Sequence, residues 1–121
     1  MNAALNYGYT LILSSFNREI VSCGYLTQLG LFHDNMFNPF NLASDLMEPF
    51  RVLVDRKVYE MKPDKFEHKE KMKLLALFQD IVIIGGRHEY VSNAIKLYTK
   101  SIFDAISDED ISLIKFYNYE L

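Results

Sequence analysis

The sequence predicts a mainly all-α fold, a helical bundle domain with one short β-hairpin. Two long segments repeat apolar residues every three or four positions, which is the spacing that lines one face of an α-helix. Two apolar or β-branched runs flank Gly85-Gly86, and this arrangement is typical of a hairpin. Because the chain has 121 residues and 50% of them are hydrophobic, we expect residues 1–121 to form a single helical domain with a real core.

The first helix is predicted to run from about Asn2 to a stop supplied by Gly24. Its apolar stripe is broad, so we expect this helix to be central and buried on most sides. The residues that form the stripe are Leu5, Tyr9, Ile12, Phe16 and Ile20. A native protein rarely starts inside its most buried helix, and we therefore expect this chain to be the C-terminal part of a longer protein.

A helical turn and a loop with turn-forming residues are predicted over residues 25–41, and a second long helix follows from about Leu42 to Met61. Pro49 falls inside that helix. Proline donates no backbone hydrogen bond, so the carbonyl of Asp45 should lose its usual partner. The helix is expected either to kink at the proline or to use that carbonyl.

The later elements alternate between helix and hairpin. The charged residues 62–73 are predicted to begin a third helix that ends near Gln79. The hairpin should pack on the helices or extend another sheet, because a two-stranded hairpin is marginal alone. Ser92 is expected to cap a helix that ends near Ile106, and Ser107 to cap a short terminal helix.

Composition limits the classes of function. The formal net charge is −3 and the pI is about 5.5, which by itself argues against a nucleic-acid-binding protein. A single cysteine, Cys23, rules out an intramolecular disulfide and suits a reducing cytosol. The sequence has no visible signal peptide or membrane-spanning run, so we expect a cytoplasmic protein without membrane contact.

Three residues form a candidate metal site. Asp45 and Glu48 lie three apart on one helical face beside the apolar stripe, so at least one carboxylate should be drawn toward the edge of the core. A carboxylate there is costly unless it is paired or binds a cation, and His33 in the preceding loop can add a ring nitrogen. Such mixed ligands favour Mn²⁺, with Mg²⁺ possible. The alternatives are a plain surface ion pair between Glu48 and Arg51 and a satisfied core histidine at position 33.

Cationic side chains on and after the second helix are the only plausible contacts to a DNA backbone. Arg51 and Lys57 are the first candidates, followed by the lysines at positions 62, 65, 69, 71 and 73. Acids are interspersed among these lysines, so the segment also suits an ordinary solvated helix face. His68 and His88 are expected to be surface residues.

Several segments together resemble the spacer-acquisition integrase family of CRISPR immunity, whose members are also described as CRISPR-associated endonucleases. The likeness runs in order from about residue 2 to residue 55 and continues more weakly from Ile81 to Ile106. It is nearest to the variant found in systems with one large effector nuclease. The matching segments are Asn2-Ala3-Ala4-Leu5-Asn6-Tyr7-Gly8-Tyr9, Gly24-Tyr25, Gly30-Leu31-Phe32-His33, Asp45-Leu46-Met47-Glu48-Pro49-Phe50-Arg51 and Leu53-Val54-Asp55.

The resemblance implies a metal-dependent DNA endonuclease and integrase that inserts new spacers into a CRISPR array. In that family a glutamate, a histidine and a second acid bind one divalent metal ion, Mn²⁺ or Mg²⁺. His33 falls on the histidine and Glu48 on the second acid, while Asp45 would orient Arg51 or a bound water. The reaction implied is attack by the 3′-hydroxyl of a DNA fragment on a phosphodiester at the repeat boundary.

The resemblance also predicts what lies outside these residues. The family's first glutamate, the first part of the helical domain and a β-rich domain that builds the homodimer all lie upstream of the motif at residues 2–9. We therefore expect the 121 residues alone to bind metal poorly and to show little or no activity. The implied partners are DNA, a second copy of the protein and a small second CRISPR acquisition protein.

A hypothesis from another class is a non-catalytic helical assembly module. Its aromatic surface would bind a protein partner, and its acids would serve only in salt bridges. Manganese titration separates the two hypotheses, since only the enzyme needs Glu48 and His33 to bind a cation.

Overall fold

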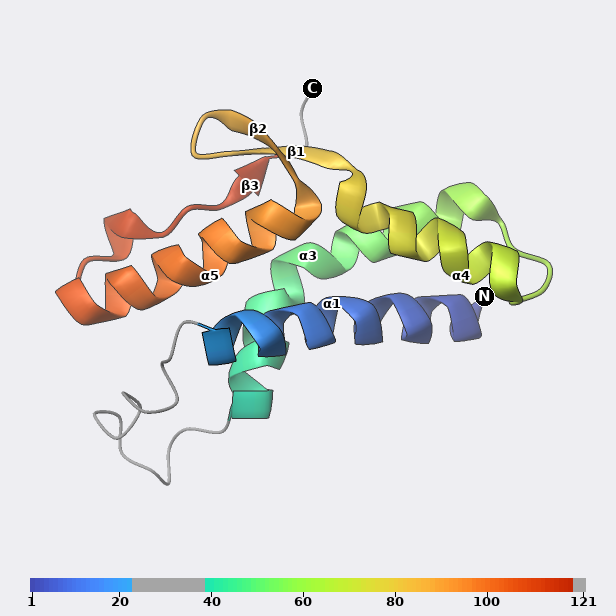
Figure 1. Cartoon of the computed structure of the whole chain (residues 1–121), viewed down its shortest axis with the longest axis horizontal. Coiled ribbons are helices and arrows are strands. Elements are labelled where there is room, and N and C mark those ends of the chain that lie inside the picture. The colour runs from blue at the N-terminus through green and yellow to red at the C-terminus, as the bar shows by residue number, and fades with distance from the viewer. Residues whose placement is uncertain (23–38, 119–121) are drawn as a thin grey trace.

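The computed structural model describes residues 1–22 and 39–118. Figure 1 shows a mainly helical molecule with a small antiparallel sheet beside α5, which confirms the predicted fold class. The predictions for Cys23, Gly24, His33 and the loop before residue 39 lie outside the described residues. Across the two described ranges, no helix is both long and apolar enough to cross a bilayer.

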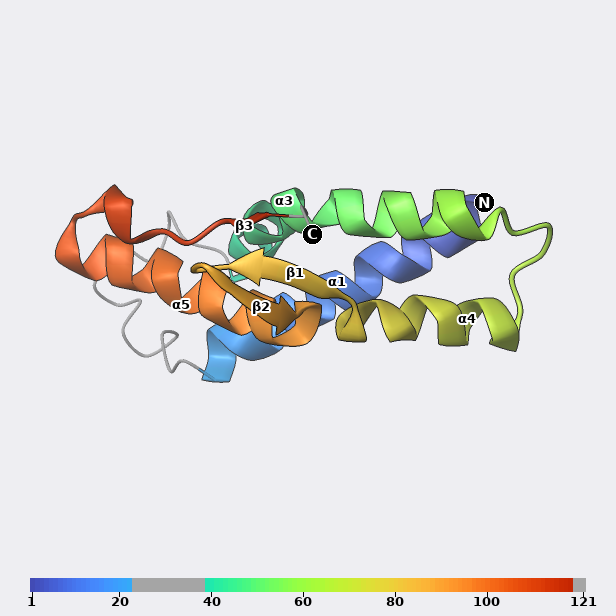
Figure 2. The ribbon, with the colours of Figure 1, turned by 90° about the horizontal axis from the view of Figure 1, so that it is seen from above.

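Helix α1 (Asn2–Ser22) is the central helix, as predicted, but it is buried on one side and not on most sides. It contacts α3, α4 and α5, and Figure 2 shows it crossing obliquely behind α3 and α4. Ile12, Phe16 and Ile20 are buried, whereas Leu5 and Tyr9 are only partly buried. The N-terminal end of the predicted stripe therefore lies near the molecular surface.

Helix α3 (Pro39–Met61) begins earlier than predicted and contains Pro49. Pro39 suits the first position of this helix, because the amide there has no partner within the helix. Figure 1 shows α3 changing direction between its teal first part and its green remainder, and a kink is one of the two outcomes expected from Pro49. The hydroxyl of Tyr117 donates a hydrogen bond to the carbonyl of Pro49 and so attaches the C-terminal segment to this helix.

The charged segment after α3 is not helical from residue 62, so this prediction is wrong. Lys62 adopts a left-handed backbone conformation (φ 47°), and Pro63 follows it. Both features stop a helix. Helix α4 (His68–Leu75) begins only where Glu67 and Glu70 form a capping box, in which each side chain accepts a hydrogen bond from the other residue's backbone amide.

The predicted hairpin is present as β1 (Ile81–Ile84) and β2 (Arg87–Tyr90), and a 3₁₀ turn (Ala76–Gln79) leads into it. Gly85 and Gly86 have positive φ angles of 60° and 75°, as a two-residue hairpin loop requires. Sequence reasoning missed β3 (Tyr117–Asn118), which pairs antiparallel with β1 and gives the strand order β2-β1-β3. The hairpin therefore extends into a three-stranded sheet as well as packing on α5.

Helix α5 (Val91–Asp108) is longer than predicted at both ends. Ser92 lies within its first turn rather than at the cap. Ser107 is also helical, so the prediction of a separate terminal helix capped by this serine is wrong. The chain leaves α5 through Glu109 in a left-handed conformation (φ 52°), and Asp110 then caps a single 3₁₀ turn.

Aromatic rings fill the core where α1, α3 and α5 meet. The ring of Phe50 is the centre of this cluster, with centroids 5.3 Å from Phe16, 5.5 Å from Tyr98 and 4.7 Å from Tyr117. Phe16 and Phe50 are completely buried. Tilted and edge-on ring pairs at these distances add to the energy of burial, so the cluster fixes how the inner face of α3 sits.

Candidate metal-binding site

Asp45 and Glu48 lie on the exposed side of α3. The buried side of the same stretch is occupied by Leu46, Met47 and Phe50. The expectation that at least one carboxylate is drawn toward the core is therefore wrong, because apolar neighbours fill that side. The side chain of Glu48 is 62% exposed, which leaves its carboxylate accessible to a cation from solvent.

Glu48 forms an ion pair with Arg51, three residues further along α3. Nη1 of Arg51 lies 3.0 Å from Oε1 of Glu48. This is the surface ion pair that the spacing suggested, but it does not preclude metal binding, because a carboxylate has two oxygens and the bond uses one of them. Hydrogen bonding to Glu48 raises the pKa of the Arg51 guanidinium, so Arg51 is cationic at every working pH.

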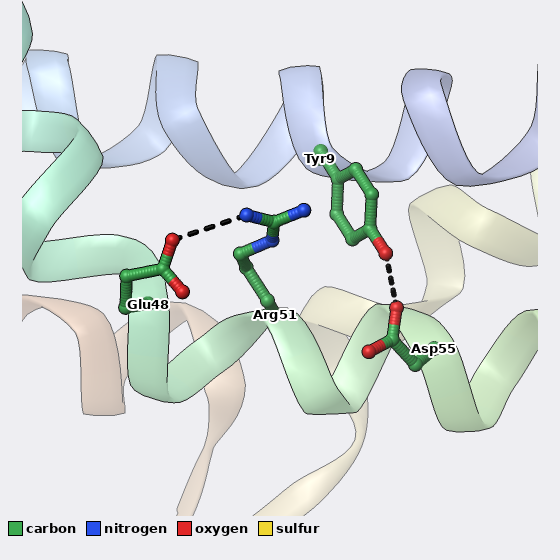
Figure 3. A network of polar contacts seen from close by, with 4 residues as sticks. All are labelled: Tyr9, Glu48, Arg51 and Asp55. Atoms are coloured by element: carbon green, nitrogen blue, oxygen red, sulfur yellow. Dashed lines mark hydrogen bonds and ion pairs between the residues drawn. The ribbon is translucent and has the colours of Figure 1, made fainter.

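The guanidinium of Arg51 lies against the ring of Tyr9 on α1, as Figure 3 shows. Its Cζ is 4.4 Å from the ring centroid, a cation–π distance. The hydroxyl of Tyr9 donates a hydrogen bond to Oδ1 of Asp55 on α3, and this bond, followed by burial, raises the pKa of the phenol. Tyr9, Glu48, Arg51 and Asp55 thus form one set of contacts across two helices, which we call the α1–α3 network.

A glycine lets α1 and α3 come close enough for these contacts. Gly8 is buried, and a Cβ at this position would overlap Cγ1 of Val54 on α3. Valine has a stiff χ1 torsion, so its side chain cannot easily move aside. The close approach brings the next residue, Tyr9, over Arg51. Gly8 therefore has a packing role in a helix where its conformational freedom would otherwise be unfavourable.

Sequence reasoning gave Tyr9 and Asp55 no role in the site. Tyr9 was predicted as part of an apolar stripe, and the two residues are 46 positions apart, so helical spacing cannot connect them. A usable signal was present, since a partly buried phenol usually has a hydrogen-bond partner. Asp55 follows Arg51 by four residues and so lies on the same helical face.

Lys57 does not lie in the α1–α3 network. Its Nζ is 2.9 Å from Oδ2 of Asp80, and its side chain is 24% exposed, so Lys57 forms an ion pair to the segment before β1. Its contact with DNA stays a prediction. His68 and His88 are exposed, which confirms the prediction for both. The lysines of the following segment are all exposed, at positions 62, 65, 69, 71 and 73.

The donor chemistry of Asp45 and Glu48 fits a hard divalent cation, since Mn²⁺ and Mg²⁺ prefer carboxylate oxygens. Within the part of the chain that the structure describes, no three His, Cys, Asp or Glu side chains come together as a metal-binding group. A cation at Glu48 would therefore need further ligands. His33, the predicted nitrogen ligand, lies outside the described residues.

The sequence matches one protein-family model, described as CRISPR associated protein Cas1, over residues 1–99. This range includes all four residues of the α1–α3 network.

Individual relatives agree with the family match. The chain is 34% identical over 120 residues to the CRISPR-associated endonuclease Cas1 of Neisseria meningitidis serogroup C, a match that covers 95% of this chain and 40% of the relative. It is 43% identical over 61 residues to the CRISPR-associated endonuclease Cas1 1 of Thermodesulfovibrio yellowstonii, covering 50% of this chain and 19% of that protein. A third relative, the CRISPR-associated endonuclease Cas1 1 of Francisella tularensis subsp. novicida, is 28% identical over 101 residues, which is 79% of this chain and 31% of the relative. The chain thus spans two fifths or less of the length of these proteins.

Proposed function

The chain belongs to the CRISPR-associated Cas1 family, and from this premise we propose that the whole protein is a metal-dependent DNA endonuclease and integrase. Its proposed reaction inserts new spacers into a CRISPR array, and its proposed location is the cytoplasm, where such DNA lies. The observation that carries the proposal is the accessible Glu48 carboxylate on α3, inside the region that matches the family.

The proposed reaction is a transesterification. The 3′-hydroxyl oxygen of an incoming DNA fragment attacks a phosphorus atom at the repeat boundary and forms a new P–O bond. The attacking hydroxyl loses its proton, the bond from that phosphorus to the 3′-oxygen of the repeat strand breaks, and the departing oxygen takes up a proton. One phosphodiester replaces another, so the step needs no external source of energy.

Glu48 and His33 are the residues that we propose as ligands of Mn²⁺ or Mg²⁺, with a third ligand supplied from upstream of this chain. When bound, such an ion supplies Lewis-acid stabilisation of the charge that grows on the phosphoryl oxygens. Glu48 would bind the ion through one carboxylate oxygen, while Arg51 donates a hydrogen bond to the other, Oε1. We propose that Asp45, which is exposed one turn earlier on α3, orients Arg51 or a bound water.

The net negative charge of the chain is compatible with DNA binding if other parts of the assembled complex supply contacts to the DNA phosphates. We propose a homodimer and a small second acquisition protein as those further contributors. Within the described residues, the exposed lysines between residues 62 and 73 are the better candidates for phosphate contacts, because Lys57 is paired with Asp80.

A second candidate function is a non-catalytic assembly module, and the exposed apolar side chains are compatible with it. Tyr59 is 71% exposed, Phe116 64% and Ile111 84%. Exposed apolar side chains mark contact surfaces when they are contiguous. An enzyme that assembles with partners also needs such surfaces, so they do not separate the two functions.

Metal titration and DNA strand joining separate them in the full-length gene product. We expect Glu48→Ala and His33→Ala to weaken Mn²⁺ binding by at least about tenfold and to reduce strand joining by on the order of a hundredfold. The matched control is Glu60→Ala, because Glu60 is also exposed on α3 and pairs with Arg56. It should leave both measurements unchanged.

Unchanged metal affinity and strand joining in both Glu48→Ala and His33→Ala would refute the enzyme proposal. The 121-residue chain alone provides an additional test. We expect it to bind Mn²⁺ weakly and to join strands little or not at all. Strong activity of this short chain would show that the proposed upstream ligand is not needed.

A further inference from the structure

Two neighbouring side chains, those of Glu48 and Tyr9, hold the guanidinium of Arg51 in place. It bonds to Glu48 at 3.0 Å through Nη1, and the ring of Tyr9 covers its face at 4.4 Å. The ring is fixed in turn, since the Tyr9 hydroxyl bonds to Asp55 one turn further along α3 (Figure 3). The contacts therefore run as a chain from Asp55 to Tyr9, from Tyr9 to Arg51 and from Arg51 to Glu48.

An exposed glutamate without such a contact samples many rotamers, and binding a cation would have to select one of them. The bond from Arg51 occupies Oε1 of Glu48 and restricts the plane of the carboxylate. The other oxygen is then presented to solvent in a limited range of directions. Carboxylates that bind metals are commonly hydrogen-bonded in this way by neighbouring groups.

A positive charge beside a cation ligand has an opposing effect. Arg51 repels a divalent ion and competes with it for the carboxylate. This repulsion is weakened by water, because the side chain of Arg51 is 43% exposed and that of Glu48 is 62% exposed. The orientation of Arg51 has further support, since Tyr9 contacts its guanidinium from α1 and bonds to Asp55 on α3.

We propose that Arg51 is a positioning residue that orients Glu48 for a divalent cation, and that Tyr9, anchored by Asp55, positions Arg51. This inference rests on the proposed function, in which Glu48 is a metal ligand. It adds a role for residues on α1, which would support a ligand on α3 without touching the ion.

The test measures Mn²⁺ affinity of the full-length gene product by electron paramagnetic resonance. Arg51→Lys keeps the charge but loses the planar fork, and should weaken binding about tenfold. Arg51→Met removes the charge as well and should also weaken binding. Tyr9→Leu should weaken binding about threefold, the size of an exposed cation–π contact. Arg56→Lys is the matched control, since Arg56 pairs with Glu60 on the same helix, and it should change nothing.

A double-mutant cycle gives the readout that a merely structural role would not produce. If Tyr9 acts through Arg51, Tyr9→Leu should have no further effect on Mn²⁺ affinity in the Arg51→Met background. Thermal unfolding monitors whether each variant is folded. Should Tyr9→Leu fail to fold, Tyr9→Phe and Asp55→Ala replace it, because each removes the anchoring hydrogen bond between these two side chains and both should weaken Mn²⁺ binding similarly.

Two results would overturn the positioning role. Tighter Mn²⁺ binding in Arg51→Met would mean that Arg51 only competes with the cation. If Tyr9→Leu weakened Mn²⁺ binding equally in the unchanged protein and in the Arg51→Met variant, Tyr9 would not act through Arg51. Glu48→Gln separates these failures from failure of the proposed function, because affinity that survives this change would show that Glu48 is not a ligand at all.

Discussion

The two faces of α3 hold their side chains in different ways. On the inner face, Phe50 is completely buried among the rings of Phe16, Tyr98 and Tyr117. On the outer face, Glu48 and Arg51 are exposed to solvent and are fixed by directed polar contacts. Packing on the inner face stabilises the fold, whereas the outer face can bind a ligand without loss of the core. We therefore expect substitutions on the two faces to change different measurements.

The largest effect should come from the inner face. Phe50→Ala removes a fully buried ring and should lower the free energy of unfolding by about 3–5 kcal/mol. Urea denaturation measures this loss. Arg51→Ala on the outer face is the matched comparison and should shift the urea midpoint far less, because its side chain is 43% exposed. Similar losses in the two variants would contradict the division between the faces.

A smaller effect is expected where the two helices touch. Gly8→Ala places a methyl group against Val54 and should destabilise the protein by about 1–2 kcal/mol, since overpacking outweighs the gain in helix propensity. Thermal or urea unfolding checks the value. The double variant Gly8→Ala, Val54→Ala should be less destabilised than the sum of its parts, because the shorter side chain makes room. Simple additivity would show that Gly8 is not required for the close approach.

The bond between the C-terminal segment and α3 gives a third and smaller expectation. Tyr117→Phe keeps the ring beside Phe50 but removes the hydroxyl that donates to the carbonyl of Pro49, and should cost about 1 kcal/mol. Tyr59→Phe is the control, because Tyr59 is 71% exposed and should contribute little. Equal unfolding free energies for the Tyr117→Phe variant and the unchanged protein would mean that this hydrogen bond does not stabilise the helix.

The smallest effect concerns pH and the outer face. The hydrogen bond to Asp55 raises the pKa of the Tyr9 phenol. The contribution of this bond to stability is therefore complete below the ordinary pKa of a phenol and is lost as the pH rises through the raised pKa. Ultraviolet titration of tyrosinate, taken as the difference between the unchanged protein and Tyr9→Phe, isolates this group. Asp55→Asn should move the transition to lower pH. A transition that stays in place would show that Asp55 does not set it.

The elements with strong local patterns could be predicted from the sequence, and those formed by distant pairing could not. The stripe around Ile12 and Phe16 predicted α1, and Gly85-Gly86 predicted the hairpin. Strand β3 has only two residues, and β2 and α5 lie between it and its partner β1 in the sequence. No local periodicity can therefore predict it. The start of α4 was misplaced because charge alone does not fix a helix boundary, whereas the capping box does.

The same distinction applies to the candidate site. The pair of Glu48 and Arg51 follows from a spacing of three on one helix, and the sequence predicted it. The contacts of Tyr9 depend on the packing of α1 against α3, which no spacing within either helix encodes. Burial was also misjudged at Asp45 and Glu48, because an amphipathic pattern locates the apolar stripe better than it locates the residues at its edge.

The central claim is that Glu48 and His33 bind the same cation, and anomalous diffraction from crystals of the full-length gene product grown with Mn²⁺ tests it most directly. The account predicts a manganese peak about 2 Å from a carboxylate oxygen of Glu48 and from a ring nitrogen of His33. A peak bound by other residues, or an imidazole of His33 on the opposite side of the helices from Glu48, would contradict it.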